Sequence, residues 1–132
     1  MKLKNGNKMT EQTANVNSIS RISEGTVVKG QIGTGNDIRV DGVVEGKITA
    51  SGRVVVGESA SIKGTIVCAN LDLWGKVEGD LYVKEVLSVK GTAEIAGNVY
   101  VRKFQVEMGA RFNGVCKMIT EEDFDKMDET QA

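Results

Sequence analysis

A glycine that recurs between two apolar residues constrains the fold of this chain more than any other feature. The unit apolar-x-Gly-x-apolar is centred on Gly30, Gly46, Gly64, Gly79, Gly97 and Gly114. Successive glycines stand 16, 18, 15, 18 and 17 residues apart. Because glycine weakens an isolated strand, its return at similar spacing indicates a structural position that every repeat shares.

A second alternating apolar pair lies between neighbouring glycines. The pairs are Ile38/Val40, Val54/Val56, Leu71/Leu73, Leu87/Val89 and Phe104/Val106. The connection from a pair to the next glycine unit covers four residues, as from Val40 to Val44, or six, as from Val56 to Ile62. The spacing therefore varies mainly in one turn, and we expect the strands to keep their register.

Stacking the repeats produces columns of aliphatic residues that should point inward. The column two residues before the glycine runs Val28, Val44, Ile62, Val77, Ile95 and Phe112. No repeat can bury its own apolar face, so the repeats must stack on one another. Coils of 15 to 18 residues with tight turns predict an all-β fold, a single-domain parallel β-helix of about six coils over residues 25–118. At about 4.8 Å per coil, the rod would be roughly 29 Å long.

The outward columns test the same alignment. The residue before the glycine alternates in sign over four coils, as Lys29, Glu45, Lys63 and Glu78, which is a favourable ladder of cross-strand neighbours. Three residues after the glycine, an apolar and aromatic column runs Val67, Tyr82 and Tyr100. We expect this column to be exposed. It serves either stacking between coils or lateral contact with another rod or partner.

Composition excludes several kinds of chemistry. The chain has 132 residues, 17 of them basic and 18 acidic, and no histidine. Absence of histidine removes histidine-activated nucleophiles and three-histidine zinc catalysis, and the balanced charge favours no nucleic-acid partner. Cys68 and Cys116 fall in inward columns three coils apart, too far for a disulfide. We therefore predict no enzyme and no catalytic, cofactor-binding or metal-binding residue.

Both ends of the chain look different from the repeats. Residues 1–24 are rich in Asn, Ser, Thr and Lys, and residues 119–132 hold six acids against one lysine, so we expect flexible tails. A β-helix leaves unpaired backbone and apolar core open at each end unless something covers them. A short helical turn in the C-terminal tail could cover one end. Otherwise both ends stay open, and rods should stack end to end into a filament.

The residues expected at the two open ends follow from the columns. At the C-terminal end they are Phe104, Val106, Phe112 and Met118, and at the N-terminal end they are Val28, Ile32, Ile38 and Val40.

The ordered set of repeats resembles the bactofilins. The resemblance rests on "GTVVKGQI", "DIRVDGVVEGKI", "GRVVVGESASIKGTI" and "GARFNG", and it covers residues 19–118. It implies a right-handed, roughly triangular β-helix that polymerises without bound nucleotide into bacterial cytoskeletal filaments. Such filaments would lie in the cytoplasm, at the inner face of the membrane, and support cell shape, cell-wall synthesis or protein positioning. The implied partners are further copies of the chain, cell-wall enzymes or other scaffolded proteins.

The resemblance also implies roles for particular residues. Phe112, in "GARFNG", stands where the family has a phenylalanine that supports subunit contact. Many members attach to the membrane through a short N-terminal peptide, and residues 1–9 here offer Met1, Lys2, Leu3, Lys4, Lys8 and Met9. One basic residue near an anionic surface contributes about 1 kcal/mol, so three with little apolar area would bind weakly.

Two other classes of β-helical protein fit the sequence less well. A left-handed β-helix acyltransferase needs an even period near 18 and a catalytic histidine, whereas these coils are uneven and histidine is absent. A monomeric binding module with one flat threonine face would repeat Thr in a single outward column. Here Thr34, Thr49, Thr65 and Thr92 occupy different columns.

Overall fold

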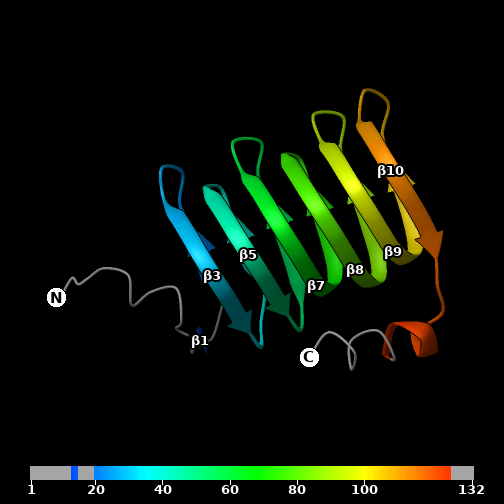
Figure 1. Cartoon of the computed structure of the whole chain (residues 1–132), viewed down its shortest axis with the longest axis horizontal. Helices are drawn as coiled ribbons and strands as arrows, with labels where there is room; N and C mark the ends of the chain where they lie inside the picture. The colour runs from blue at the N-terminus through cyan, green and yellow to red at the C-terminus, as the bar shows by residue number, and fades with distance from the viewer. Residues whose placement is uncertain (1–12, 15–19, 126–132) are drawn as a thin grey trace, which may run out of the picture.

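Ten parallel strands wind into a single rod in the computed structural model, which describes residues 13–14 and 20–125. The strands are β1 (Thr13–Ala14), β2 (Ser20–Ile22), β3 (Val27–Thr34), β4 (Ile38–Val40), β5 (Val43–Ala50), β6 (Arg53–Val56), β7 (Ser61–Leu73), β8 (Lys76–Val89), β9 (Glu94–Val106) and β10 (Arg111–Met118). Each strand pairs in parallel with strands of the neighbouring coils, so the coils lie side by side along the rod (Figure 1). The predicted parallel β-helix is confirmed.

Strand pairing confirms the repeat alignment along the whole rod. The glycines pair in one unbroken column, from Gly30 opposite Gly46 to Gly97 opposite Gly114. Lys29 stands opposite Glu45, and Lys63 opposite Glu78, as the charge ladder requires. Inside, 23 buried hydrophobic residues form one continuous cluster. The core therefore runs through every coil without a break.

The recurring glycine bends each coil between two short straight sections. In a regular strand, every second residue faces the same side, so Gly46 would face inward like Val44 and Ile48. Gly46 is exposed, however, while Val44 and Ile48 are buried. All six repeat glycines have φ between 130° and 154°. A β-carbon on Gly79 would also collide with the carbonyl oxygen of Gly64 on the next coil. Both the backbone conformation and the close stacking require glycine here.

The variable turns lie together at one corner of the rod. In the six-residue connections, a backbone hydrogen bond closes the turn. The connection before β7 is an example, in which the Ala60 N–H donates to the Gly57 carbonyl at 3.0 Å. Figure 1 shows the taller loops leading into β3, β7, β9 and β10. The four-residue connections are tighter. At Gly75, a β-carbon would collide with the Gly57 and Ala60 carbonyls.

The rod begins before the expected boundary at residue 25. β2 pairs with β4, placing Ile22 opposite Val40, and the Ile22 carbonyl accepts a hydrogen bond from the Asp41 N–H at 2.7 Å. β1 pairs with Gly33 and Thr34. These strands add a partial coil, because Ile22 packs against the core in the column of Val40. Placing residues 20–24 in a flexible tail was therefore wrong.

The C-terminal segment lies against the side of the rod. The Ile119 N–H donates to the Val101 carbonyl at 2.9 Å, and a helical turn follows at residues 121–125. Figure 1 shows this turn beyond the lower end of β10. Ile119 and Phe124 pack on the column of Val67, Tyr82 and Tyr100. The helical turn considered as an end cap is present, but it covers a side face instead.

Candidate assembly surfaces

An apolar surface lies open at the C-terminal end of the rod. β10 pairs with β9 along one edge, and no strand within the described residues pairs with its other edge. Among the residues that the structure describes, four of the five large exposed hydrophobic residues lie at this end: Val106, Met108, Val115 and Met118 are 48%, 97%, 62% and 57% exposed. An unpaired edge next to exposed apolar side chains is a template for pairing with another chain.

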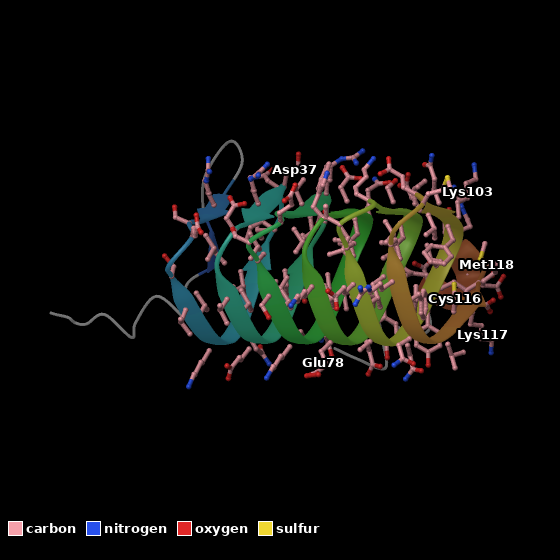
Figure 2. The ribbon with its side chains drawn as sticks, turned by 90° about the horizontal axis from the view of Figure 1, so that it is seen from above. Asp37, Glu78, Lys103, Cys116, Lys117 and Met118 are labelled. Atoms are coloured by element: carbon pink, nitrogen blue, oxygen red, sulfur yellow. The ribbon has the colours of Figure 1, made fainter. Side chains whose placement is uncertain are left out.

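Two phenylalanines form the partly covered centre of this end. The Phe104 and Phe112 rings meet edge to face, with centroids 5.8 Å apart and planes 75° apart. Both rings are half-buried, as is Cys116. Figure 2 shows Cys116, Lys117 and Met118 together at the end of the rod. The structure thus brings together the predicted residues Phe104, Val106, Phe112 and Met118, and their part in assembly stays a prediction.

The N-terminal end differs from its predicted surface. Val28, Ile38 and Val40 are only 5%, 2% and 0% exposed, and Ile32 is half-buried. Expecting Ile38 and Val40 to lie open was wrong, because β2 adds a further layer beneath them. Among the described residues, the exposed features of this end include the side chain of Val27, at 57%, the edge of β3 before Gly33 and the outer edge of β2, neither of which a described strand covers. The two ends are therefore chemically unlike.

A charged cluster joins the first coils at the N-terminal end. Arg39 donates to the Asp41 carboxylate from Nε at 2.9 Å and Nη2 at 3.2 Å, and Arg21 Nη2 lies 3.4 Å from it. The hydrogen bond from Arg39 lowers the pKa of Asp41, although burial opposes the shift. Asp41 is only 8% exposed, although it follows directly after the strand β4 in a turn. The cluster ties β2 to the coil above it.

The side column of Val67, Tyr82 and Tyr100 is covered. The two tyrosine rings stack with centroids 5.0 Å apart and planes 8° apart. Val67 is 3% exposed because Ile119 and Phe124, themselves 6% and 7% exposed, pack over the column. Burial raises the pKa of Tyr82. The expectation that this column lies exposed was wrong for Val67, since the chain supplies its own cover. The predicted stacking between coils is present at the two tyrosines, which are half-buried.

Sequence reasoning missed the covering segment although a local signal marks it. The Asp123 N–H donates to Thr120 Oγ1 at 3.1 Å, and the Thr120 N–H donates to Asp123 Oδ2 at 3.2 Å. Reciprocal bonds of this kind form a capping box, which Thr-x-x-acid predicts from sequence. "TEED" at residues 120–123 carries that pattern.

The rest of the described surface carries two features of note, a shallow hollow and a stacked lysine. Within the described ranges no group of three or more metal-ligating side chains comes together, and no helix is long and apolar enough to cross a membrane. A hollow of about 290 Å³ is lined by Arg39, Gly57, Glu58 and Trp74. Lys90 Nζ lies 5.4 Å from the Trp74 ring centroid. The lining of the hollow contains no Ser, Thr or Cys side chain.

The two thiols are free, as the column assignment requires. Cys68 is buried in the core, and burial raises the pKa of both cysteines. Low reactivity is therefore expected at Cys68. The predicted membrane residues Met1, Lys2, Leu3, Lys4, Lys8 and Met9 lie outside the described residues.

The chain is a β-solenoid whose distinctive surfaces are its two ends. The family model for bactofilins, described as polymer-forming cytoskeletal, matches residues 20–117, and this chain belongs to the bactofilin family. It is also similar to Bactofilin BacO from Myxococcus xanthus strain DK1622, at 25% identity over 93 residues, covering 70% of this chain and 74% of that protein. No solved structure matches at a significant level.

Proposed function

We propose that this bactofilin is a non-enzymatic scaffold that assembles end to end into filaments without bound nucleotide. Its open C-terminal end supports this most strongly, since the unpaired edge of β10 lies beside Val106, Val115 and Met118. Pairing that edge with another molecule would extend the sheet and bury those side chains together. Burial of apolar surface contributes about 25 cal/mol per Å², which favours such a contact.

Electron microscopy and sedimentation of the purified full-length chain test this proposal. Filaments should appear in buffer without nucleotide, because no step in the end contact requires one. A monodisperse monomer at micromolar concentration would contradict the proposal and favour a monomeric binding module instead.

A charge placed at the C-terminal end should prevent assembly. In Phe112→Arg, a guanidinium replaces a half-buried ring in contact with Phe104. Burying an unpaired charge in an apolar contact costs several kcal/mol, so the concentration at which polymer first sediments should rise by about a hundredfold. Circular dichroism should remain rich in β structure, because the central coils keep their core.

Phe112→Leu is the matched control, since it keeps an apolar side chain at the same position. It should assemble at a concentration close to that of the wild type. Unchanged polymerisation of Phe112→Arg would place the interface elsewhere.

We further propose peripheral attachment at the inner face of the cytoplasmic membrane through residues 1–9, as a platform for cell shape, cell-wall synthesis or positioning of other proteins. The mixture of Met1, Leu3 and Met9 with three lysines supports this. Flotation with anionic liposomes should be weakened when Lys2, Lys4 and Lys8 become glutamine, since each lysine contributes about 1 kcal/mol. Equal flotation of the variant and the wild type would dismiss the peptide as an anchor.

A further inference from the structure

Residues 119–124 form a segment, here termed the clasp, that ties the last strand to three coils. It begins directly after Met118, the final residue of β10. Its first residue continues the strand pairing, because the Ile119 N–H donates to the Val101 carbonyl of β9 at 2.9 Å. The chain then turns back along the side of the rod.

Two apolar side chains carry the contact of the clasp with the rod. Ile119 and Phe124 are 6% and 7% exposed, and they form one buried cluster with Val67 of β7, Tyr82 of β8 and Tyr100 of β9. The stacked tyrosines present a broad flat surface to this cluster. Phe124 is therefore anchored on coils well inside the rod, where strands are paired on both edges.

Polar contacts orient the clasp between these anchors. Glu121 lies between two cations, with Oε2 3.3 Å from Arg102 Nη1 and Oε1 3.9 Å from Lys84 Nζ. The Glu121 side chain is 55% exposed, so these pairs contribute little stability by themselves. The reciprocal hydrogen bonds between Thr120 and Asp123 fix the start of the helical turn.

β10 is a terminal strand for which such an anchor matters. It is paired along one edge, and the outer end of its sequence, from Val115 to Met118, is largely exposed. Terminal elements with few buried contacts open locally at low free-energy cost. The same residues make up the open apolar end of the rod, so fraying of β10 would break up the surface proposed for assembly.

We propose that Phe124 and Ile119 are positioning residues for assembly, which hold β10 in the register that presents the C-terminal end to another molecule. This inference rests on the proposed end-to-end assembly for its purpose. The holding action itself is a property of the single chain. It can therefore be tested separately from polymerisation.

Amide hydrogen exchange of the full-length, unassembled chain measures the holding action. Phe124→Ala removes the anchor, and exchange in β10 should become about tenfold faster or more, while β7 and β8 stay unchanged. Phe124→Leu should restore slow exchange, because an apolar side chain still covers the tyrosines. Asp125→Asn is the matched control, because Asp125 is an exposed residue of the same helical turn. Unchanged exchange of β10 in Phe124→Ala would overturn the proposal.

The consequence for assembly is read from the concentration at which polymer first sediments. That concentration should rise several-fold in Phe124→Ala and return to the wild-type value in Phe124→Leu, with circular dichroism unchanged in both. If Phe124→Ala instead forms thicker bundles at an unaltered concentration, the clasp only shields the tyrosine column and the proposal is wrong. Should the wild type form no filaments, proposed end-to-end assembly fails, and the exchange experiment still decides whether the clasp holds β10.

Discussion

Each repeat glycine stands directly on the backbone of the glycine one coil away. The stack leaves no room for a β-carbon, and the positive φ of each glycine excludes other residues on conformational grounds as well. The conformation and the contact therefore select the same residue type at the same place. This explains why a residue that weakens isolated strands recurs at the same position in every coil of the rod.

At the residue scale, we predict that Gly79→Ala is strongly destabilising. Its φ of 138° is strained for alanine, and the new β-carbon would collide with the Gly64 carbonyl. The cost should be about 3 kcal/mol, which corresponds to a fall of about 10 °C in the midpoint of thermal unfolding. Circular dichroism during heating measures it.

Gly35→Ala is the control for this prediction, because a β-carbon there meets nothing within 4 Å. The φ angle of Gly35 also lies outside the positive range that favours glycine. Its midpoint should stay within a few degrees of the wild type. Equal midpoints for the two variants would show that the glycine column is dispensable.

At the scale of the strand and turn, the alternation of inward and outward residues made most of the rod predictable. A one-residue slip would turn every inward side chain outward, so the columns of Val44, Leu81 and Val99 have a single consistent alignment. Ile22 escaped prediction because its strand contributes one apolar residue within a serine-rich stretch. Its turn, "ISEG", nevertheless resembles "VGES" at residues 56–59.

The clasp was not predictable in the same way. Phe124 lies alone in an acidic run, and no periodic pattern links it to Val67 or Tyr82. What it covers is decided by the path of the chain after β10, which has no counterpart in the repeats. The position of the open C-terminal end, by contrast, followed directly from the last repeat.

The charged cluster of the first coils gives a prediction that depends on pH. Asp41→Asn should lower stability by about 1 kcal/mol at neutral pH, because it removes the charge-assisted hydrogen bonds from Arg39. The pKa of Asp41 lies below its ordinary value of 3.8 in the folded chain, so its stabilising effect is present above that value. The effect is lost as the pH falls through the pKa of the folded chain.

Thermal midpoints of the wild type and Asp41→Asn should therefore converge in strong acid. Glu85→Gln removes an exposed carboxylate from β8 and serves as the matched charge control. A difference that persists unchanged into strong acid would mean that Asp41 acts through its shape and not through its charge.

For the whole molecule, the inequality of the two ends matters most. The C-terminal end exposes four large hydrophobic side chains, whereas β2 and the cluster around Asp41 reinforce the N-terminal end. A junction between two C-terminal ends should therefore differ in strength from a junction between two N-terminal ends. Breakage at one particular kind of junction would show that like ends meet, whereas a junction of unlike ends is the same throughout an assembly.

Cys116 offers a probe of the C-terminal junction, at the scale of the whole rod. In the unassembled chain it is partly exposed while Cys68 is buried, so alkylation should modify Cys116 first. Assembly should slow that reaction by about tenfold, because the thiol would lie inside the contact. Mass spectrometry after timed alkylation measures both rates.

The Phe112→Arg variant is the control for this measurement, and Cys116 should keep its full reactivity there at every concentration. Rapid alkylation of Cys116 within wild-type filaments would show that the contact leaves this part of the end uncovered.

The corner that holds the four- and six-residue connections has a further consequence for how such a chain can evolve. Two extra residues at this corner lengthen a coil without moving any inward column. The connection that leads into β7 is six residues long and the one that leads into β8 is four, yet Ile62 and Val77 still pair. Insertions at this corner would not disturb the packing of the core, so stability would not select against them. In a polymer, they would recur along one ridge at regular intervals, which is where new functions could be acquired without altering the shape of the fibre.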